Sequence, residues 1–66
     1  MELTVNGKKQ QLENVETLED VIKHYKLKKG LIVIEVDGEI IDRAKWADTK
    51  VSPGMKIELV HFVGGG

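Results

Sequence analysis

Hydrophobic and polar residues alternate near both ends of the chain, and this two-residue period indicates a half-buried β-strand. Residues 2–6 place Leu3 and Val5 on one face, and residues 55–59 repeat the same alternation. Residues 31–36 are different, because they are almost all apolar and rich in β-branched side chains. Such a run predicts a central strand that is buried on both faces. The two ends and the middle of the chain are therefore expected to form one sheet.

Two dipeptides predict tight turns between strands. Asn6-Gly7 and Asp37-Gly38 suit the paired positive-φ positions of a type I′ hairpin turn. Residues 8–12 then form a returning strand, and their lysines are typical of an edge strand that resists pairing with other chains. Residues 39–41 return after the second turn.

A helix is predicted to begin after Thr17. Thr17 and Asp20 have the spacing of a capping box, in which each side chain bonds to the backbone of the other residue. Gly30 is the expected terminator of this segment, and Asp42 is expected to cap a short helical turn over residues 43–46. One apolar stripe follows the helical period and consists of Leu18, Val21, Ile22 and Tyr25.

The order of these elements is hairpin, helix, strand, short strand and final strand. A single helix across one face of a mixed sheet lets both elements bury an apolar side. This α+β order resembles a ubiquitin-like β-grasp, although a ferredoxin-like half and an SH3-like barrel remain alternatives. We expect residues 1–63 to form the β-grasp domain and residues 64–66 a flexible C-terminal glycine tail.

Composition narrows the functional classes. A chain of 66 residues without cysteine, and with only two distant histidines, offers no disulfide and no zinc motif. The formal net charge of −1 gives no reason to expect nucleic acid or an anionic membrane as a partner. The longest apolar run, residues 31–34, is too short to cross a bilayer, and no signal peptide is recognised. The expectation is a cytoplasmic protein that is monomeric when free and binds no metal.

The C-terminus departs from the pattern of an ordinary last strand. The inward-facing residues of the last strand end at Leu59. The apolar character nevertheless continues through Val60, Phe62 and Val63, and Val60 and Phe62 fall on the face that should be solvated. Apolar groups in such a place predict a patch for docking a partner. Gly64 to Gly66 follow, and glycine's lack of a Cβ suits a tail that enters a narrow channel. Remnants of an engineered linker are the alternative interpretation of these glycines.

Over essentially its whole length the sequence resembles the ThiS family, the sulfur carriers of thiamine biosynthesis. The matching segments are residues 1–7, 17–22, 34–41, 43–46 and 57–66. The last segment is the most specific, since it combines the final strand with the terminal Gly65-Gly66 pair that the family requires. A terminal Gly-Gly alone is shared with ubiquitin and with the small subunit of molybdopterin synthase.

The resemblance implies a chemistry for the tail. A ThiF-like adenylating enzyme would use ATP and Mg²⁺ to activate the Gly66 carboxylate. Sulfur from cysteine, relayed through a cysteine desulfurase, would convert it to a thiocarboxylate, and the thiazole synthase ThiG would take that sulfur. Gly64 and Gly65 would thread the tail into the partner, while Val60, Phe62 and Val63 would dock. The carrier itself would hold no catalytic residue and no cofactor, so it would not be an enzyme.

Three alternatives remain open from the residues. A ubiquitin-like modifier would join Gly66 to a lysine of another protein. A carrier similar to the molybdopterin synthase small subunit would serve a different sulfur-transfer pathway. A plain binding domain would not need its terminal glycines at all.

Overall fold

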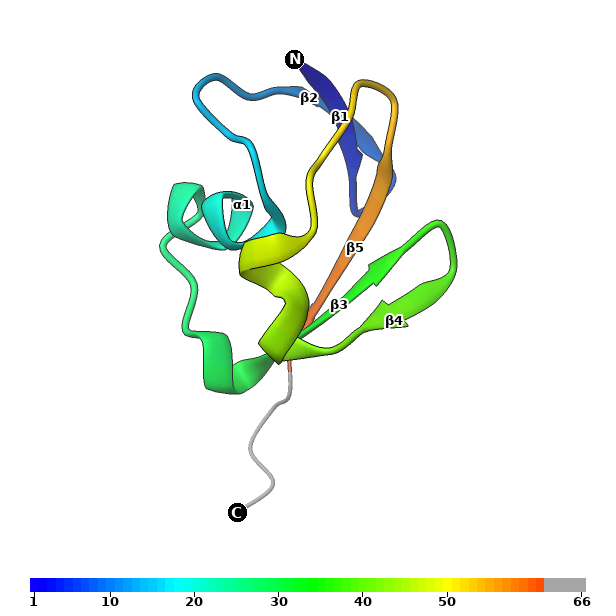
Figure 1. The fold of residues 1–66 in the computed structure, drawn as a ribbon. Helices are drawn as coiled ribbons and strands as arrows, with labels where there is room; N and C mark the ends of the chain where they lie inside the picture. Colours follow the sequence, from blue (N-terminus) through cyan, green and yellow to red (C-terminus); the bar gives the residue numbers. More distant parts are fainter. Residues whose placement is uncertain (62–66) are drawn as a thin grey trace.

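Figure 1 shows the computed structural model, which describes residues 1–61. Within this range a five-stranded sheet carries a layer of helices on one face. The strands are β1 (Glu2–Val5), β2 (Lys8–Gln11), β3 (Ile32–Val36), β4 (Glu39–Ile41) and β5 (Lys56–His61). The helical segments are α1 (Leu18–His24) and the 3₁₀ helices η1 (Lys29–Leu31) and η2 (Arg43–Asp48). The glycine tail at 64–66 and the predicted domain end at 63 lie outside the described residues.

The strands are ordered β2-β1-β5-β3-β4, so the last strand of the chain lies at the centre of the sheet. β5 pairs in parallel with β1 and antiparallel with β3, and both hairpins are antiparallel. The sheet is therefore mixed, and α1 belongs to the connection that leads from the first hairpin to β3. This is the arrangement of the expected ubiquitin-like β-grasp.

One apolar core lies between the sheet and the helical layer. Its buried members are Leu3, Val5, Leu12, Val15, Leu18, Val21, Ile22, Ile32, Ile34, Trp46, Val51 and Ile57. No polar or charged residue is buried within residues 1–61. The indole Nε1 of Trp46 donates to the carbonyl oxygen of Ile41 at 3.0 Å, which satisfies the one polar atom of that side chain. The short helix predicted after Asp42 forms as η2, but the Asp42 side chain makes no capping hydrogen bond.

Both predicted hairpin turns are confirmed. Asn6 and Gly7 have φ values of 50° and 81°, and Asp37 and Gly38 have values of 50° and 89°. Two consecutive positive φ angles define the type I′ turn. Asn6 has a second role, because its Oδ1 accepts a hydrogen bond from the Leu59 N–H at 2.7 Å and ties the first hairpin to β5.

The capping box at the start of α1 is also confirmed. Thr17 Oγ1 accepts from the Asp20 N–H at 3.3 Å, while the Asp20 carboxylate accepts from the Thr17 N–H at 3.1 Å. The same carboxylate oxygen accepts from the Glu16 N–H at 2.9 Å. These bonds satisfy donors that the first turn of a helix otherwise leaves without partners.

Replacing the cap residue is expected to weaken the whole domain. Thr17→Ala removes the hydroxyl acceptor and should lower the free energy of unfolding by about 0.5–2 kcal/mol. Thr17→Ser retains the hydroxyl and should stay close to the wild type. Urea denaturation followed by circular dichroism measures both variants. Equal stabilities for the alanine and serine variants would show that the hydroxyl has no capping role.

The same cap predicts a dependence of stability on pH. Hydrogen bonds from the backbone N–H groups of Glu16 and Thr17 favour the charged carboxylate and lower the pKa of Asp20 below its usual 3.8. A lowered pKa in the folded state contributes stability above the pKa of the unfolded chain, and this contribution is lost as the pH falls through the folded value. Thermal unfolding between pH 6 and about 2 should therefore show a smaller acid-induced loss in Asp20→Asn than in the wild type. An identical pH dependence would contradict the role of Asp20.

The predicted end of the helix at Gly30 is wrong. The helix ends at His24, and Lys26 takes the left-handed conformation with φ 57°. The N–H groups of Lys26 and Leu27 donate to the carbonyls of Lys23 and Ile22 at 3.0 and 3.1 Å. These two bonds form a Schellman motif, which usually has glycine where Lys26 lies. The chain therefore turns before Gly30, and that glycine lies within η1.

The prediction that residues 31–36 are buried on both faces is also wrong. Ile32 and Ile34 are buried, whereas Val33 and Glu35 are only half-buried and alternate with them. Leu31 precedes the strand and is 47% exposed. The physical reason is that the helices cover one face of the sheet only, so β3 follows the two-residue period of a half-buried strand. Val33 is thus apolar on a face that the core does not use.

Candidate functional site

The uncovered face of the sheet carries an apolar patch formed by Val33, Ile40 and Val60, which we call the open-face patch. Val33 and Val60 lie directly opposite each other on β3 and β5. Ile40 pairs with the next outward residue of β3, Glu35, and is therefore diagonal to Val33. Ile40 is 71% exposed and Val60 is 44% exposed. Exposed apolar side chains gathered in this way are typical of a protein–protein contact.

The patch lies at the end of the sheet from which the chain continues toward its C-terminus. Val60 is the last but one residue of β5, and His61 ends the strand opposite Ile32. The predicted orientation of Val60 is confirmed, because it alternates with buried Ile57 and half-buried Leu59. The remaining predicted docking and tail residues lie outside the described range and stay predictions: Phe62, Val63, Gly64, Gly65 and Gly66.

Sequence reasoning missed Val33 and Ile40 as members of this surface. One signal was available, since residues 31–36 have apolar side chains at positions where a half-buried strand normally has polar ones. That signal was interpreted as burial on both faces. Only the strand register shows that Val33 lies beside Val60.

Two carboxylates border the open-face patch. Glu35 and Glu58 are directly opposite each other on β3 and β5, two residues along each strand from the pair of valines. Lys56 lies two residues before Glu58 on the same face, opposite Thr4 of β1. Neither glutamate forms an ion pair with any residue between 1 and 61. The open face beside the patch therefore carries two carboxylates and, two residues along β5, one lysine.

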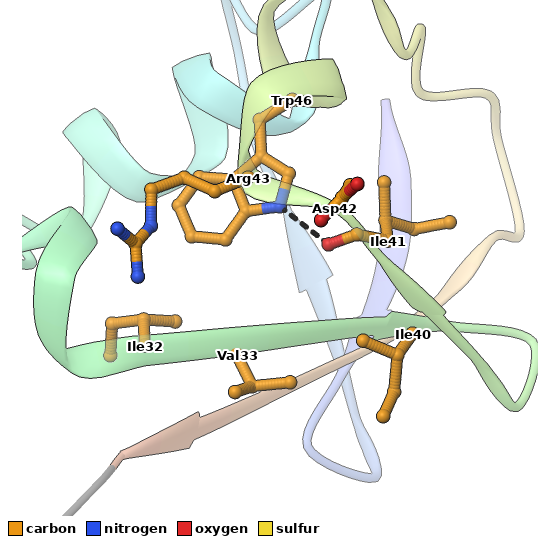
Figure 2. Close-up of a pocket in the computed structure, with 7 residues that line it drawn as sticks. All are labelled: Ile32, Val33, Ile40, Ile41, Asp42, Arg43 and Trp46. Atoms are coloured by element: carbon orange, nitrogen blue, oxygen red, sulfur yellow. Dashed lines mark hydrogen bonds between the residues drawn. The ribbon is translucent and has the colours of Figure 1, made fainter.

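A shallow hollow of about 440 Å³ adjoins the patch beyond the end of β4, beside Ile32 and Val33 at the start of β3. In Figure 2 Trp46, Arg43 and Ile32 lie on the helical side of β3, and Val33 and Ile40 lie on the opposite side. Among residues 1–61 its charged lining consists of Asp42 and Arg43. The hollow contains no serine, histidine or lysine in its lining, and its indole nitrogen already donates to a backbone carbonyl. Such a lining suits contact with a partner better than covalent catalysis.

The described residues contain no group of three or more potential metal ligands. His24 contacts Tyr25 edge to face, with ring centroids 5.0 Å apart, and His61 is exposed at the end of β5. Neither histidine belongs to such a group in this part of the chain. Among the helices of residues 1–61, none has the length and apolar character needed to span a membrane.

Comparisons with known proteins agree with this geometry. The model of the ThiS family matches residues 1–66. The sulfur carrier protein ThiS of Bacillus subtilis is 32% identical over 65 residues, which are 97% of this chain and 98% of that protein. A thiazole synthase of Paramagnetospirillum magneticum is 29% identical over 66 residues, and the chain spans only 20% of its length.

The structural comparison leads to the same family. The crystal structure of the thiamine biosynthesis protein ThiS from Geobacter metallireducens matches with a TM-score of 0.84 and 30% identity, over all of both chains. Fold and open face together define a small ubiquitin-like β-grasp protein with exposed apolar side chains on the uncovered face of its sheet. Within that class the chain belongs to the ThiS family, and it is a sulfur carrier of thiamine biosynthesis.

Proposed function

We propose that the carboxylate of Gly66 is the group that carries sulfur. A ThiF-like enzyme adenylates it, a sulfur donor converts it to a thiocarboxylate, and the thiazole synthase ThiG receives the sulfur. The observation that carries this proposal is the match to the ThiS family over residues 1–66, which extends through the terminal glycines. Gly64 and Gly65 precede the reacting group and allow close approach to a narrow active site.

The chemistry requires activation because a carboxylate is a poor electrophile. An oxygen of the Gly66 carboxylate attacks the α-phosphorus of ATP, so pyrophosphate leaves and an acyl-adenylate forms. A persulfide, supplied from cysteine through a cysteine desulfurase, then attacks the acyl carbon, and AMP leaves. A thiol of the partner reduces the resulting acyl disulfide, which releases the thiocarboxylate and leaves a disulfide on the partner. Mg²⁺ on the partner enzyme offsets the charge of the phosphates. The chain contributes the acyl group and no cysteine of its own.

The thiazole synthase relative supports the choice of sulfur acceptor. A segment similar to this chain occupies 20% of that protein, so a carrier-like segment occurs there within a thiazole synthase. Two activities in one chain raise the effective concentration of one for the other. We therefore assign ThiG as the partner that consumes the thiocarboxylate, while the ThiF-like enzyme produces it.

The open-face patch provides a contact between the folded domain and the partner enzyme, which a tail of glycines cannot provide. Val60 lies next to the point where the chain leaves the sheet, and Val33 and Ile40 extend the surface away from it. We assign this patch, with Phe62 and Val63, to partner docking. Catalytic groups, ATP and Mg²⁺ belong to the partner enzymes in this scheme.

Intact-mass measurement of the protein from cells grown without thiamine tests the proposal. We expect a fraction that is heavier by the replacement of one oxygen with sulfur, mapped by fragmentation to Gly66. Gly66 joined to lysines of other proteins would instead support a ubiquitin-like modifier. Detection of neither form under thiamine starvation would contradict the carrier chemistry at Gly66.

A further inference from the structure

The pair formed by Glu35 and Glu58 violates a rule of sheet stability. These residues are direct cross-strand partners on the uncovered face, and like charges in that position are destabilising. No cation among residues 1–61 forms an ion pair with either carboxylate. Lys56 lies on the same face but forms no ion pair with either glutamate within residues 1–61. A local conflict of this kind is expected at functional surfaces.

The surroundings indicate what would relieve the repulsion. Glu35 is half-buried between Ile40 and Glu58, and the Val33–Val60 pair forms the next row of the same face. A partner that covers these apolar side chains removes water from the two carboxylates as well. Desolvated carboxylates are costly unless a cation bonds to them. The partner surface therefore requires a positive group at this position.

We infer that Glu35 and Glu58, together with the open-face patch, receive an arginine side chain from an apolar surface of the adenylating enzyme; this inference rests on the proposed function. The planar guanidinium has five N–H donors and bonds to carboxylates through two parallel hydrogen bonds. One guanidinium can therefore contact both glutamates, and its weak hydration suits a contact ringed by Val33, Val60 and Ile40.

The adenylating enzyme fits this role better than the thiazole synthase. The synthase relative contains a carrier-like segment within its own chain, where covalent linkage already supplies a high effective concentration. In our scheme this chain is separate from both enzymes, and the adenylating enzyme is the one that first captures the unmodified carrier from solution. Complementary charges increase the association rate in that situation.

The test compares Glu35→Gln, Glu58→Gln and the double variant as substrates of the ThiF-like enzyme in ATP–pyrophosphate exchange. The double variant should raise the KM for the carrier about 10-fold, with a smaller change in kcat. Its KM should also depend less on salt than that of the wild type. Asp48→Asn is the matched control, because Asp48 is exposed on η2 in the helical layer, away from the open face. It should behave as the wild type.

The thermal midpoint of the free carrier distinguishes a lost contact with the partner from a defect in folding. Removing the like-charge pair should leave the thermal midpoint of the free carrier unchanged or higher, even though binding is weaker. Glu58→Lys should raise this midpoint, by pairing with Glu35, and still impair adenylation. An unchanged KM for the double variant, or a lowered thermal midpoint, would overturn the inference.

The choice of partner and the underlying function are tested separately. Titration of the thiocarboxylate carrier into the thiazole synthase should give similar affinities for the double variant and the wild type. If the double variant lost affinity for the synthase alone, the arginine would belong to the synthase. That result would overturn our assignment of the arginine to the adenylating enzyme. Failure of the wild-type carrier to support any exchange would instead reject the proposed function.

Discussion

Deleting Gly65 and Gly66 is expected to abolish ATP–pyrophosphate exchange with the ThiF-like enzyme and to leave the folded domain intact. The deletion removes the acyl group that is adenylated and moves the chain end to Gly64. It also shortens the tail by two residues, about 7 Å when extended, so the new carboxylate cannot reach the same position. The core consists of residues between Leu3 and Ile57, so the unfolding midpoint should not change.

A matched deletion of Gly64 alone distinguishes tail length from tail chemistry. This variant retains the terminal Gly-Gly pair but reaches about 3.5 Å less far. We expect it to retain some exchange activity, whereas the deletion of Gly65 and Gly66 retains none. Exchange at the wild-type rate without Gly65 and Gly66 would exclude Gly66 as the adenylated residue.

The parts of the fold that were predictable from sequence are those fixed by neighbouring residues. The capping box needs only Thr17 and Asp20, and these two residues lie within one helical turn of each other. The type I′ turns need only two residues that tolerate positive φ, as Asn6-Gly7 shows. Such signals depend little on the rest of the molecule.

The end of α1 illustrates where local reasoning fails. Glycine is favoured in the left-handed position that ends a helix, so Gly30 was the natural choice. The chain instead places Lys26 there, because Leu27 packs against the core and closes the helix one turn earlier. Tertiary packing overrides the conformational preference of a single residue.

The candidate site was only partly predictable for a related reason. Val60 was found because it breaks the alternation of its own strand. Val33 and Ile40 join it through cross-strand register, which depends on how β3, β4 and β5 pair. The facing carboxylates of Glu35 and Glu58 are likewise invisible until that register is known. A sequence of β-branched residues gives the strand but does not show which face the helices leave uncovered.

The two faces of β3 therefore have separate roles that adjacent residues can test. Ile34→Ala is expected to lower the free energy of unfolding by about 2–5 kcal/mol, because it leaves a cavity in the core. Ile34 is fully buried between Ile41 and Leu59 on the neighbouring strands. A domain of 66 residues has a total stability of about 3–10 kcal/mol, so this single change brings it close to unfolding.

Val33→Ala is the matched control on the other face. Val33 is half-buried and lies on the side of β3 away from the helical layer, so its loss should cost about 1 kcal/mol through reduced strand propensity and contact with Val60. The same change should raise the KM of the carrier in the adenylation assay, since it removes the centre of the open-face patch. Urea denaturation and ATP–pyrophosphate exchange, measured on both variants, give the comparison. If Val33→Ala destabilised the domain as much as Ile34→Ala while leaving the KM unchanged, Val33 would belong to the core, and the open face would lose its assignment as the docking surface.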